Sequence, residues 1–285
     1  MTTQGVTVIK VGGSILRNED AYYAAARRIA EEIEREPTWV VVSAAHRFTD
    51  ALEGLTDPAD PEEIAGLVRR QTELTGVPMP SSLESELREG AFTARTGSRD
   101  RLLAWGERAS AVALQAHVAR TGVDVPIVEL DPSSPPPWRP AALVPGFFVC
   151  DSRGEVRCFP RGGSDISAVL VGFALGTNTV RFWKDGGGIR SNEGTVSEIN
   201  SASLRARLTN TVRPLHPVAL ELAHQGGIDL ILEDPFGVWP STRVVVPAPQ
   251  RRSNRAPSAS RPPHASRTHE AGWERTVLAG LAGVP

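Results

Sequence analysis

The stretch "CFPRGGSDISAVLVGFALG" (residues 158–176) sets two glycines and a serine between an arginine and an aspartate, directly before an apolar run. The apolar run predicts a buried helix over residues 164–175. A turn that leads into a helix needs a glycine or two, but it does not need Arg161 and Asp165. Bare backbone between a cation and an anion suggests instead a turn that holds a small charged ligand.

The composition is that of an ordinary soluble globular protein, with 285 residues, 40% hydrophobic, 22% charged and a formal net charge of -2. Near-neutral charge gives no electrostatic case for a nucleic acid or an anionic membrane. No stretch approaches about eighteen consecutive apolar residues, and the N-terminus lacks a secretory pattern. Cys150 and Cys158 are too few for a zinc site or a disulfide framework. We therefore expect a cytoplasmic protein without a membrane span.

Strand-like apolar runs alternate with helical patterns over most of the chain. Strands are expected at residues 6–10, 39–44, 124–130, 179–185, 228–232 and, at an edge, 242–246. Helices are expected at residues 19–36, 60–76, 81–95, 100–121, 164–175 and 215–226. Residues 133–140 are expected to be a loop and residues 141–158 a hairpin that turns at Asp151–Gly154. This pattern predicts an α/β fold, a three-layer αβα sandwich with a mostly parallel central sheet.

The character of the sequence changes near residue 247. Residues 1–246 are expected to form one domain, and residues 247–271, rich in Pro, Ser and Arg, are expected to be disordered. Residues 272–285 form a short tail that could be helical, with no identifiable packing partner. Deletion of residues 248–285 is accordingly expected to leave activity largely unaffected.

In parallel sheets, ligands gather at the carboxyl ends of strands, beside the N-termini of helices. In "VIKVGGSIL", Lys10 belongs to the first strand, and Gly12, Gly13 and Ser14 would let backbone amides approach an anion. The segment is neither a P-loop nor a G-x-G-x-x-G fingerprint, and a Gly-Gly turn after a strand is common for purely structural reasons.

Two further strand or helix ends carry polar side chains. Ser43 ends the second strand, and Thr49 and Asp50 follow a short loop, where a helix N-cap is an adequate explanation. Glu107 stands at a glycine-marked break before an apolar helix, where the helix dipole would favour a first-turn glutamate.

The order and spacing of these segments resemble those of the aspartate kinases, which belong to the amino acid kinase family. The resemblance covers about residues 5 to 246. The pair "WGERASAV" and "RGGSD" speaks against the uridylate kinase and N-acetylglutamate kinase branches of the family. The segments that carry the resemblance are "KVGGS", "VVVSA…TDAL", "WGERASAVAL", "VPGFFVCDSRGEV", "RGGSDISAVLVGFAL", "FWKDGGGI", "VRPLHPVALELA" and "LEDPFGVWPSTRV".

The resemblance implies transfer of the γ-phosphoryl group of ATP, with Mg²⁺, to the side-chain carboxylate of an amino acid, L-aspartate first of all. Positioning and charge neutralisation would supply the catalysis. On this basis Lys10 would bridge donor and acceptor oxygens, and the amides of Gly12, Gly13 and Ser14 would hold the γ-phosphate. Lys10 and Asp165 are the candidate catalytic residues.

The resemblance also implies the acceptor contacts. Arg161 would clamp the α-carboxylate, worth about 1.5–3 kcal/mol as a charged hydrogen bond. Glu107 and Asp165 would accept from the ammonium group, and Ser43 would complete the substrate site.

The nucleotide side departs from the family pattern. Where aspartate kinases have T-D-V-D-G-[VI]-Y-T-A-D-P-R, this chain has "WKDGGGIRSNEGTV". Asp185 matches the first aspartate, and Lys184 precedes it, a variation that some family members share. The second aspartate is a glycine here, Arg190 replaces the tyrosine, and no D-P-R follows. Arg213 replaces a phosphate-contacting lysine. These changes leave ATP recognition open.

Three interpretations therefore remain. The chain is an aspartate kinase-like enzyme, a carboxylate kinase for a related amino acid in a specialised biosynthetic pathway, or a weakened or inactive homologue that binds an amino acid. Fewer than forty residues follow residue 246, so the ACT domains of regulated aspartate kinases, their feedback inhibition and their ACT-mediated dimer are not expected. A homodimer through kinase-domain surfaces is compatible with the resemblance.

Overall fold

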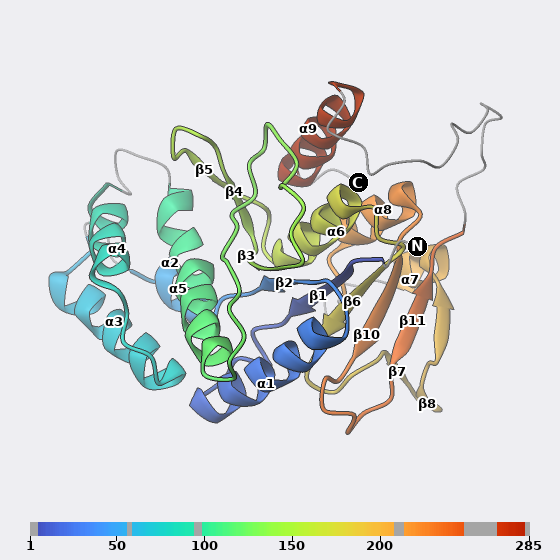
Figure 1. Cartoon of the computed structure of the whole chain (residues 1–285), viewed down its shortest axis with the longest axis horizontal. Helices are drawn as coiled ribbons and strands as arrows, with labels where there is room; N and C mark the ends of the chain where they lie inside the picture. Colours follow the sequence, from blue (N-terminus) through green and yellow to red (C-terminus); the bar gives the residue numbers. More distant parts are fainter. Residues whose placement is uncertain (1–4, 56–58, 94–98, 208–213, 248–266, 283–285) are drawn as a thin grey trace.

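The computed structural model describes residues 5–55, 59–93, 99–207, 214–247 and 267–282. Its centre is a seven-stranded sheet in the order β3-β2-β1-β6-β10-β11-β9 (Figure 1). All neighbours in it are parallel except β10 and β11, which confirms the predicted mostly parallel sheet. The strands are β1 (Thr7–Val11), β2 (Thr38–Val42), β3 (Ala141–Pro145), β6 (Thr179–Trp183), β9 (Glu198–Asn200), β10 (Asp229–Glu233) and β11 (Thr242–Val245).

Helices cover both faces of the sheet, which confirms the three-layer prediction (Figure 1). Successive residues of β1 enter opposite cores, since Val8 packs on one side while Ile9 and Val11 pack on the other. One layer comprises α1 (Glu19–Arg35), α2 (Phe48–Glu53), α3 (Pro61–Thr75), α4 (Ser81–Thr93) and α5 (Arg99–Ala119). The other comprises α6 (Ser164–Leu175), α7 (Ser201–Arg207), α8 (Pro217–Gly226) and α9 (Arg267–Ala282).

The register of the sheet places several loops side by side at the carboxyl ends of its central strands. Val11, at the end of β1, pairs with Val42 of β2 on one side and with Trp183 of β6 on the other. The residues that follow these three strands therefore emerge side by side, at the carboxyl ends where ligands bind in such sheets.

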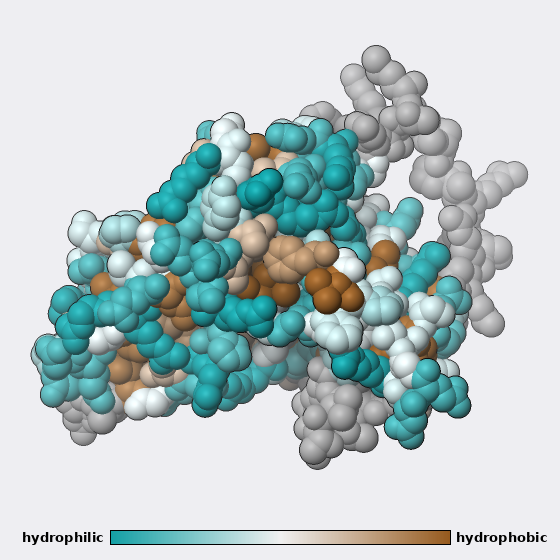
Figure 2. Space-filling model, turned by 90° about the horizontal axis from the view of Figure 1, so that it is seen from below, coloured by the Kyte–Doolittle hydropathy of each residue, from teal (hydrophilic) through white to brown (hydrophobic). Residues whose placement is uncertain are grey.

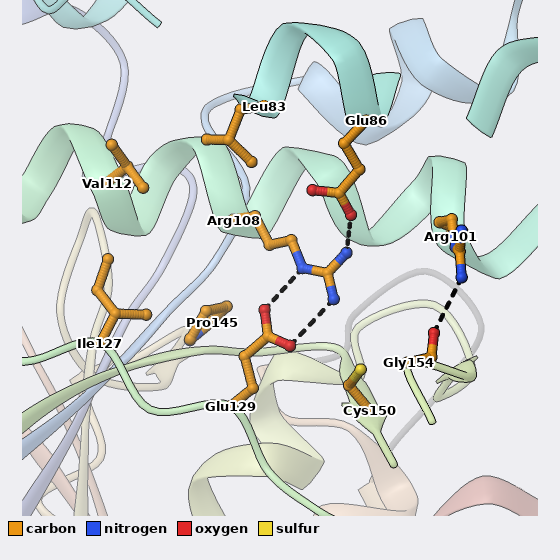
Figure 3. A pocket seen from close by; sticks show the side chains of 10 residues that line it. All are labelled: Leu83, Glu86, Arg101, Arg108, Val112, Ile127, Glu129, Pro145, Cys150 and Gly154. Atoms are coloured by element: carbon orange, nitrogen blue, oxygen red, sulfur yellow. Dashed lines mark hydrogen bonds and ion pairs between the residues drawn. The ribbon is translucent and has the colours of Figure 1, made fainter. Parts of the chain in front are cut away.

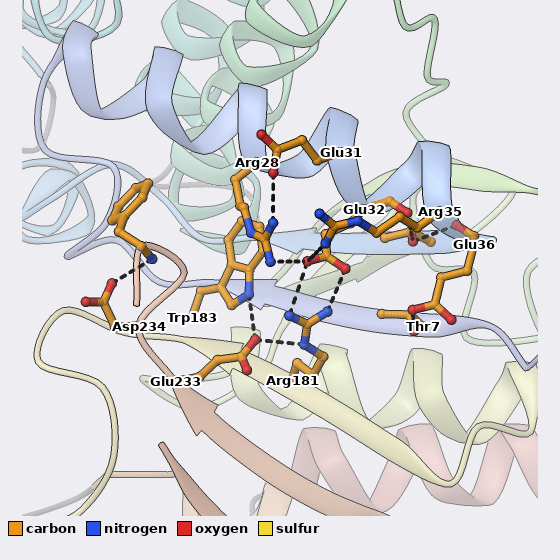
Figure 4. A network of polar contacts seen from close by, with 12 residues as sticks. Thr7, Arg28, Glu31, Glu32, Arg35, Glu36, Arg181, Trp183, Glu233 and Asp234 are labelled. Atoms are coloured by element: carbon orange, nitrogen blue, oxygen red, sulfur yellow. Dashed lines mark hydrogen bonds and ion pairs between the residues drawn. The ribbon is translucent and has the colours of Figure 1, made fainter. Parts of the chain in front are cut away.

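A partly buried polar network ties α1 to the sheet (Figure 4). Arg181 of β6 donates to both oxygens of Glu32, at 2.8 and 3.3 Å, and to Glu233 at 2.7 Å. Arg28 also pairs with Glu32 at 2.8 Å. Burial would raise the pKa of Glu32, but the neighbouring guanidinium groups outweigh it, and the pKa lies below its ordinary value. The network fixes α1 over the strands and pairs each of these charges with an opposite one.

Two predicted strands differ from the structure. Residues 124–130 contain only an isolated bridge, Ile127 to Leu143, because Pro126 lacks the N–H that a ladder needs. The edge of the sheet is formed instead by β3, so the predicted hairpin shrinks to β4 (Phe148–Cys150) and β5 (Val156–Cys158). β11 is an interior strand, since β9 pairs with its outer side. The short strands β7 (Arg190–Ser191), β8 (Gly194–Thr195) and β9 were not predicted.

The C-terminal helix α9 packs on α6 and α8. Trp273 and Val277 are fully buried in the same core as Ile166, and the Trp273 indole donates to the Asp131 carbonyl at 2.9 Å. α9 begins at Arg267, inside the segment for which disorder was predicted, and residues 248–266 lie outside the described residues. Among the described helices, none combines the length and apolar character needed to cross a membrane.

Candidate functional site

Lys10 and Asp165 form a buried ion pair at the carboxyl end of β1. The Lys10 ammonium lies 3.0 Å from Oδ1 of Asp165, in the first turn of α6. Oδ2 accepts from the backbone N–H of His216 at 3.1 Å. Burial opposes ionisation of Asp165, but Lys10 and Lys184 outweigh it, so the pKa of this carboxyl lies below its ordinary value. Asp165 is therefore a fixed negative charge that orients Lys10.

Lys184 is a second ammonium group at the same carboxylate. Its Nζ lies 4.0 Å from Asp165 Oδ2 and donates to the carbonyl of Pro214. Burial lowers the pKa of Lys184, Asp165 opposes this, and the nearby Lys10 adds to it. Two cations around one anion leave a net positive charge where the strands end, which attracts an anionic ligand.

The glycine turn after β1 leaves its backbone bare for a packing reason. A Cβ on Gly13 would lie 2.7 Å from the Ala44 carbonyl oxygen, and one on Gly12 would lie 3.0 Å from that of Trp183. The Gly12 N–H already donates to Trp183 at 3.1 Å, so it is not available to the predicted phosphate. The amides of Gly13 and Ser14 make no backbone hydrogen bond within the described residues and remain candidates.

Glu107 is a buried acid with one unsatisfied oxygen. It lies in the middle of α5, which runs unbroken from Arg99, so the first-turn explanation from the sequence is wrong. The side chain bonds to the Ala44 backbone, while Oε2 has no hydrogen-bond partner in the described part of the chain. Burial raises the pKa of Glu107 to about 8, against the Ala44 bond and the charge of Lys10. A cationic ligand that hydrogen-bonds to this carboxyl group would satisfy its free oxygen and lower the free energy of the complex.

The structure does not bring Arg161 into contact with this pair. Its guanidinium is exposed and pairs with Asp50 and, at 2.9 Å, with Glu53, both on α2. Asp50 is inside α2 rather than at its N-cap, which is Arg47 without a side-chain capping bond. These two partners could not be foreseen from local sequence, because they face Arg161 only through the tertiary fold. Ser43, which follows β2, is buried and donates its backbone N–H to Val11 at 3.2 Å.

The predicted nucleotide residues lie along the loop after β6. Asp185 pairs with Arg17 at 3.1 Å, and its backbone N–H lies 3.5 Å from the Ser14 hydroxyl. Arg190 stacks its guanidinium over the ring of Trp239, 4.2 Å from the centroid. Arg213 lies outside the described residues.

A separate hollow of about 440 Å³ lies between α4, α5 and the β4–β5 hairpin (Figure 3). Arg108 fills its centre, donating to Glu129 at 2.6 and 3.0 Å and pairing with Glu86. None of the predicted site residues lines it, and its central guanidinium already has carboxylate partners. The described residues also contain no cluster of three His, Cys, Asp or Glu that could hold a metal ion.

A lysine, a carboxylate and a bare glycine turn at the ends of parallel strands define an α/β protein that is suited to an anionic ligand. The model of the amino acid kinase family matches residues 5–134 and 138–234. The chain belongs to the amino acid kinase family.

Known proteins are similar to this chain in sequence or in fold. The aspartokinase of Thermus thermophilus is 28% identical over 110 residues, which are 36% of this chain and 27% of that protein. E. coli aspartokinase III, solved with lysine and aspartate, superposes with a TM-score of 0.68 at 19% identity, covering 86% of this chain and 66% of the other. The UMP kinase of Ureaplasma parvum gives a TM-score of 0.50 at 13% identity over 85% of this chain and all of the other. The sequence match to the Thermus aspartokinase thus spans about a quarter of the length of that protein.

Proposed function

We propose that this protein transfers the γ-phosphoryl group of ATP to the side-chain carboxylate of an amino acid, with L-aspartate as the first acceptor to test. Family membership supports phosphoryl transfer. The observation that carries the proposal is the placement of Lys10, which is 3.0 Å from Asp165 and also acts on the charge of Glu107. Lys10 would thus neutralise phosphate oxygens, and its charge favours the ionised form of Glu107, the carboxyl group that could accept from a substrate ammonium.

The donor side of the proposal depends on the bare backbone beside Lys10. Its Nζ lies only 3.8 Å from the position that a Cβ on Gly12 would occupy, so the turn and the ammonium face the same space. A bound nucleotide would supply the electrophilic γ-phosphorus. Lys10 and Lys184 would neutralise the phosphate oxygens, and the amides of Gly13 and Ser14 would donate to them.

On the acceptor side, Glu107 is the better partner for the substrate ammonium. Both oxygens of Asp165 are already engaged, by Lys10 and by the His216 amide, whereas Oε2 of Glu107 has no hydrogen-bond partner in the described part of the chain. We therefore assign Glu107 to the ammonium and Asp165 to the positioning of Lys10. Arg161 would bind the α-carboxylate by exchanging its ion pairs with α2 for the substrate, and Ser43 would line the same site.

Mg²⁺ fits this site only together with the nucleotide. The described residues offer no three-ligand cluster, and Mg²⁺ at phosphoryl-transfer sites is held largely by substrate phosphates and water. Asp185, exposed beside Ser14, is a described carboxylate that could add a ligand.

Hydroxylamine trapping tests the proposal directly, because an acyl phosphate reacts to give a hydroxamate. The full chain is incubated with ATP, Mg²⁺ and a panel of amino acids that includes aspartate, its homologues and its β-substituted analogues. Hydroxamate with aspartate supports the leading assignment, and hydroxamate with another member redirects it to a related acceptor. Amino acid binding without hydroxamate or ADP would favour the non-catalytic homologue.

A further inference from the structure

The loop between β10 and β11 presents a cluster of large apolar side chains to solvent. Phe236, Val238 and Trp239 are 48%, 71% and 45% exposed, respectively. Exposed apolar groups that gather in one short segment mark a binding surface, while isolated ones are ordinary.

This loop is held in one conformation by the residue that follows β10 (Figure 4). The carboxylate of Asp234 accepts from the backbone N–H groups of Phe236 at 3.0 Å, Val238 at 3.0 Å and Trp239 at 3.2 Å. The aromatic side chains therefore extend from a fixed backbone, and less entropy is lost when a ligand binds them.

Arg190 completes a planar surface with Trp239. Its guanidinium lies 4.2 Å from the centre of an indole ring and 3.9 Å from the position that a Cβ on Gly186 would occupy. Gly186 has a φ of 84°, a conformation that favours glycine, so no side chain covers the guanidinium there. A guanidinium stacked on an indole is a surface that attracts a further planar, aromatic group.

This surface adjoins the proposed phosphate locus. A Cβ on Gly187 would lie 2.9 Å from the Cβ of Trp239, and the Gly188 N–H donates to the Pro240 carbonyl at 2.9 Å. Figure 1 shows the loop from β10 to β11 beside β7 and β8. The chain from Lys184, at the phosphate locus, to Gly187, beside Trp239, can span no more than roughly 11 Å. A single nucleotide can bridge that separation.

We propose that Arg190 and Trp239 form the stacking platform for the base of the donor nucleotide. This inference rests on the proposed function and adds to it a residue, Trp239, for base binding. Stacking is tolerant of base identity because every base has a π-face. The platform therefore accepts adenine and guanine nucleotides alike, with purines favoured over pyrimidines by their larger ring area.

The test is a binding titration of the full-length protein with MgADP, which does not turn over. Affinity is measured by calorimetry and by tryptophan fluorescence. Trp239→Ala should weaken MgADP binding by roughly 5- to 150-fold, the range for losing one stacked base. Trp239→Phe, which keeps an aromatic ring, should restore most of the affinity. Trp138→Ala is the matched control, because Trp138 is another exposed tryptophan, at 64%, in a different part of the chain.

A base-free probe separates the platform from the phosphate locus. Tripolyphosphate should bind the wild type and the Trp239→Ala variant equally, because it has no ring to stack. An unchanged affinity of Trp239→Ala for MgADP, or an equal loss for tripolyphosphate, would overturn the platform while leaving the proposed function intact. A wild type that binds neither probe would overturn both.

Discussion

Oε2 of Glu107 lies buried without a hydrogen-bond partner in the described part of the chain, and the ammonium group of Lys10 acts on its charge while bonding Asp165 at 3.0 Å. β1, α5 and α6 thus bring one cation and two carboxylates into a single site. Because Asp165 is committed to Lys10 and Glu107 is not, the two acids have different roles. Substitution of Lys10, which is bonded to Asp165, and substitution of Glu107 should therefore have different effects.

Lys10→Met removes the charge but keeps the length of the side chain. We expect kcat to fall by about 10²–10³-fold, the usual loss for one preorganised electrostatic contact. The variant also leaves the buried Asp165 with the more distant Lys184 as its cation, beside the His216 N–H, so the free energy of unfolding should fall by about 3 kcal/mol. Steady-state kinetics and urea unfolding measure the two effects. Arg69→Met, which breaks the exposed pair with Glu62, serves as control, and full turnover by a folded Lys10→Met protein would contradict the assignment.

Glu107→Gln tests the buried acid through stability. The pKa of Glu107 is raised to about 8 in the folded protein. The contribution of protonated Glu107 to the free energy of unfolding is therefore fully present below its ordinary pKa and is lost as pH rises through about 8. Between about pH 5 and 9 the free energy of unfolding of the wild type should fall by on the order of a few kcal/mol relative to that of the glutamine variant. Urea unfolding at both pH values measures this difference. Parallel pH profiles for the two proteins would show that Glu107 titrates normally.

The same residue predicts how acceptor affinity depends on pH. An ammonium ligand prefers ionised Glu107, so the KM for the amino acid should fall as pH rises from about 6.5 towards 8. Glu107→Gln should raise KM and remove this dependence over the same pH range. Steady-state kinetics at several pH values provides the measurement, and an equal pH dependence in the variant would argue for another ammonium partner.

Much of the sheet was predictable because several of its strands are strongly apolar and are separated by segments with a helical hydrophobic pattern, although β9 was not predicted. β2 is buried along its whole length, as "WVVV" indicates. The strand predicted at residues 124–130 was wrong, because the apolar residues there are typical of a strand but Pro126 lacks the N–H that a ladder needs. Lys10 and Asp165 could be grouped because the carboxyl ends of parallel strands lie beside helix N-termini, whereas Lys184 was assigned only through the family resemblance.

The rest of the site depends on contacts between distant segments. The pairing of Arg161 with α2 follows from how α2 packs, which no local pattern encodes. Trp239 lies in a segment that carries the family resemblance, but no role was predicted for it, and only its packing against Gly187 places it near the predicted nucleotide residues. The commitment of the Gly12 amide to Trp183 is likewise a tertiary contact.

Arg161→Ala should act on acceptor binding more than on turnover. The KM for the amino acid should rise about 10- to 150-fold, equivalent to a charged hydrogen bond of about 1.5–3 kcal/mol, with kcat nearly unchanged. Unfolding free energy should change by less than about 1 kcal/mol, because the ion pairs to α2 are exposed. Asp50→Asn is the companion variant: it removes one of the two ion pairs that hold Arg161 on α2 and should lower KM. An unchanged KM in Arg161→Ala would count against the clamp.

Trp273→Ala tests whether the C-terminal helix is part of the folded domain. The sequence alone predicts that residues 248–285 are dispensable, but the indole of Trp273 is fully buried and bonded to the Asp131 carbonyl. Its loss should cost about 3–5 kcal/mol of unfolding free energy. Leu278→Ala, at a site 44% exposed on the same helix, should cost less than about 1 kcal/mol. A chain ending at Pro247 should be destabilised at least as much as Trp273→Ala, and because α9 packs on α6, which carries Asp165, its kcat should fall as well. Equal stability of Trp273→Ala and Leu278→Ala in urea unfolding would restore the prediction that the tail is dispensable.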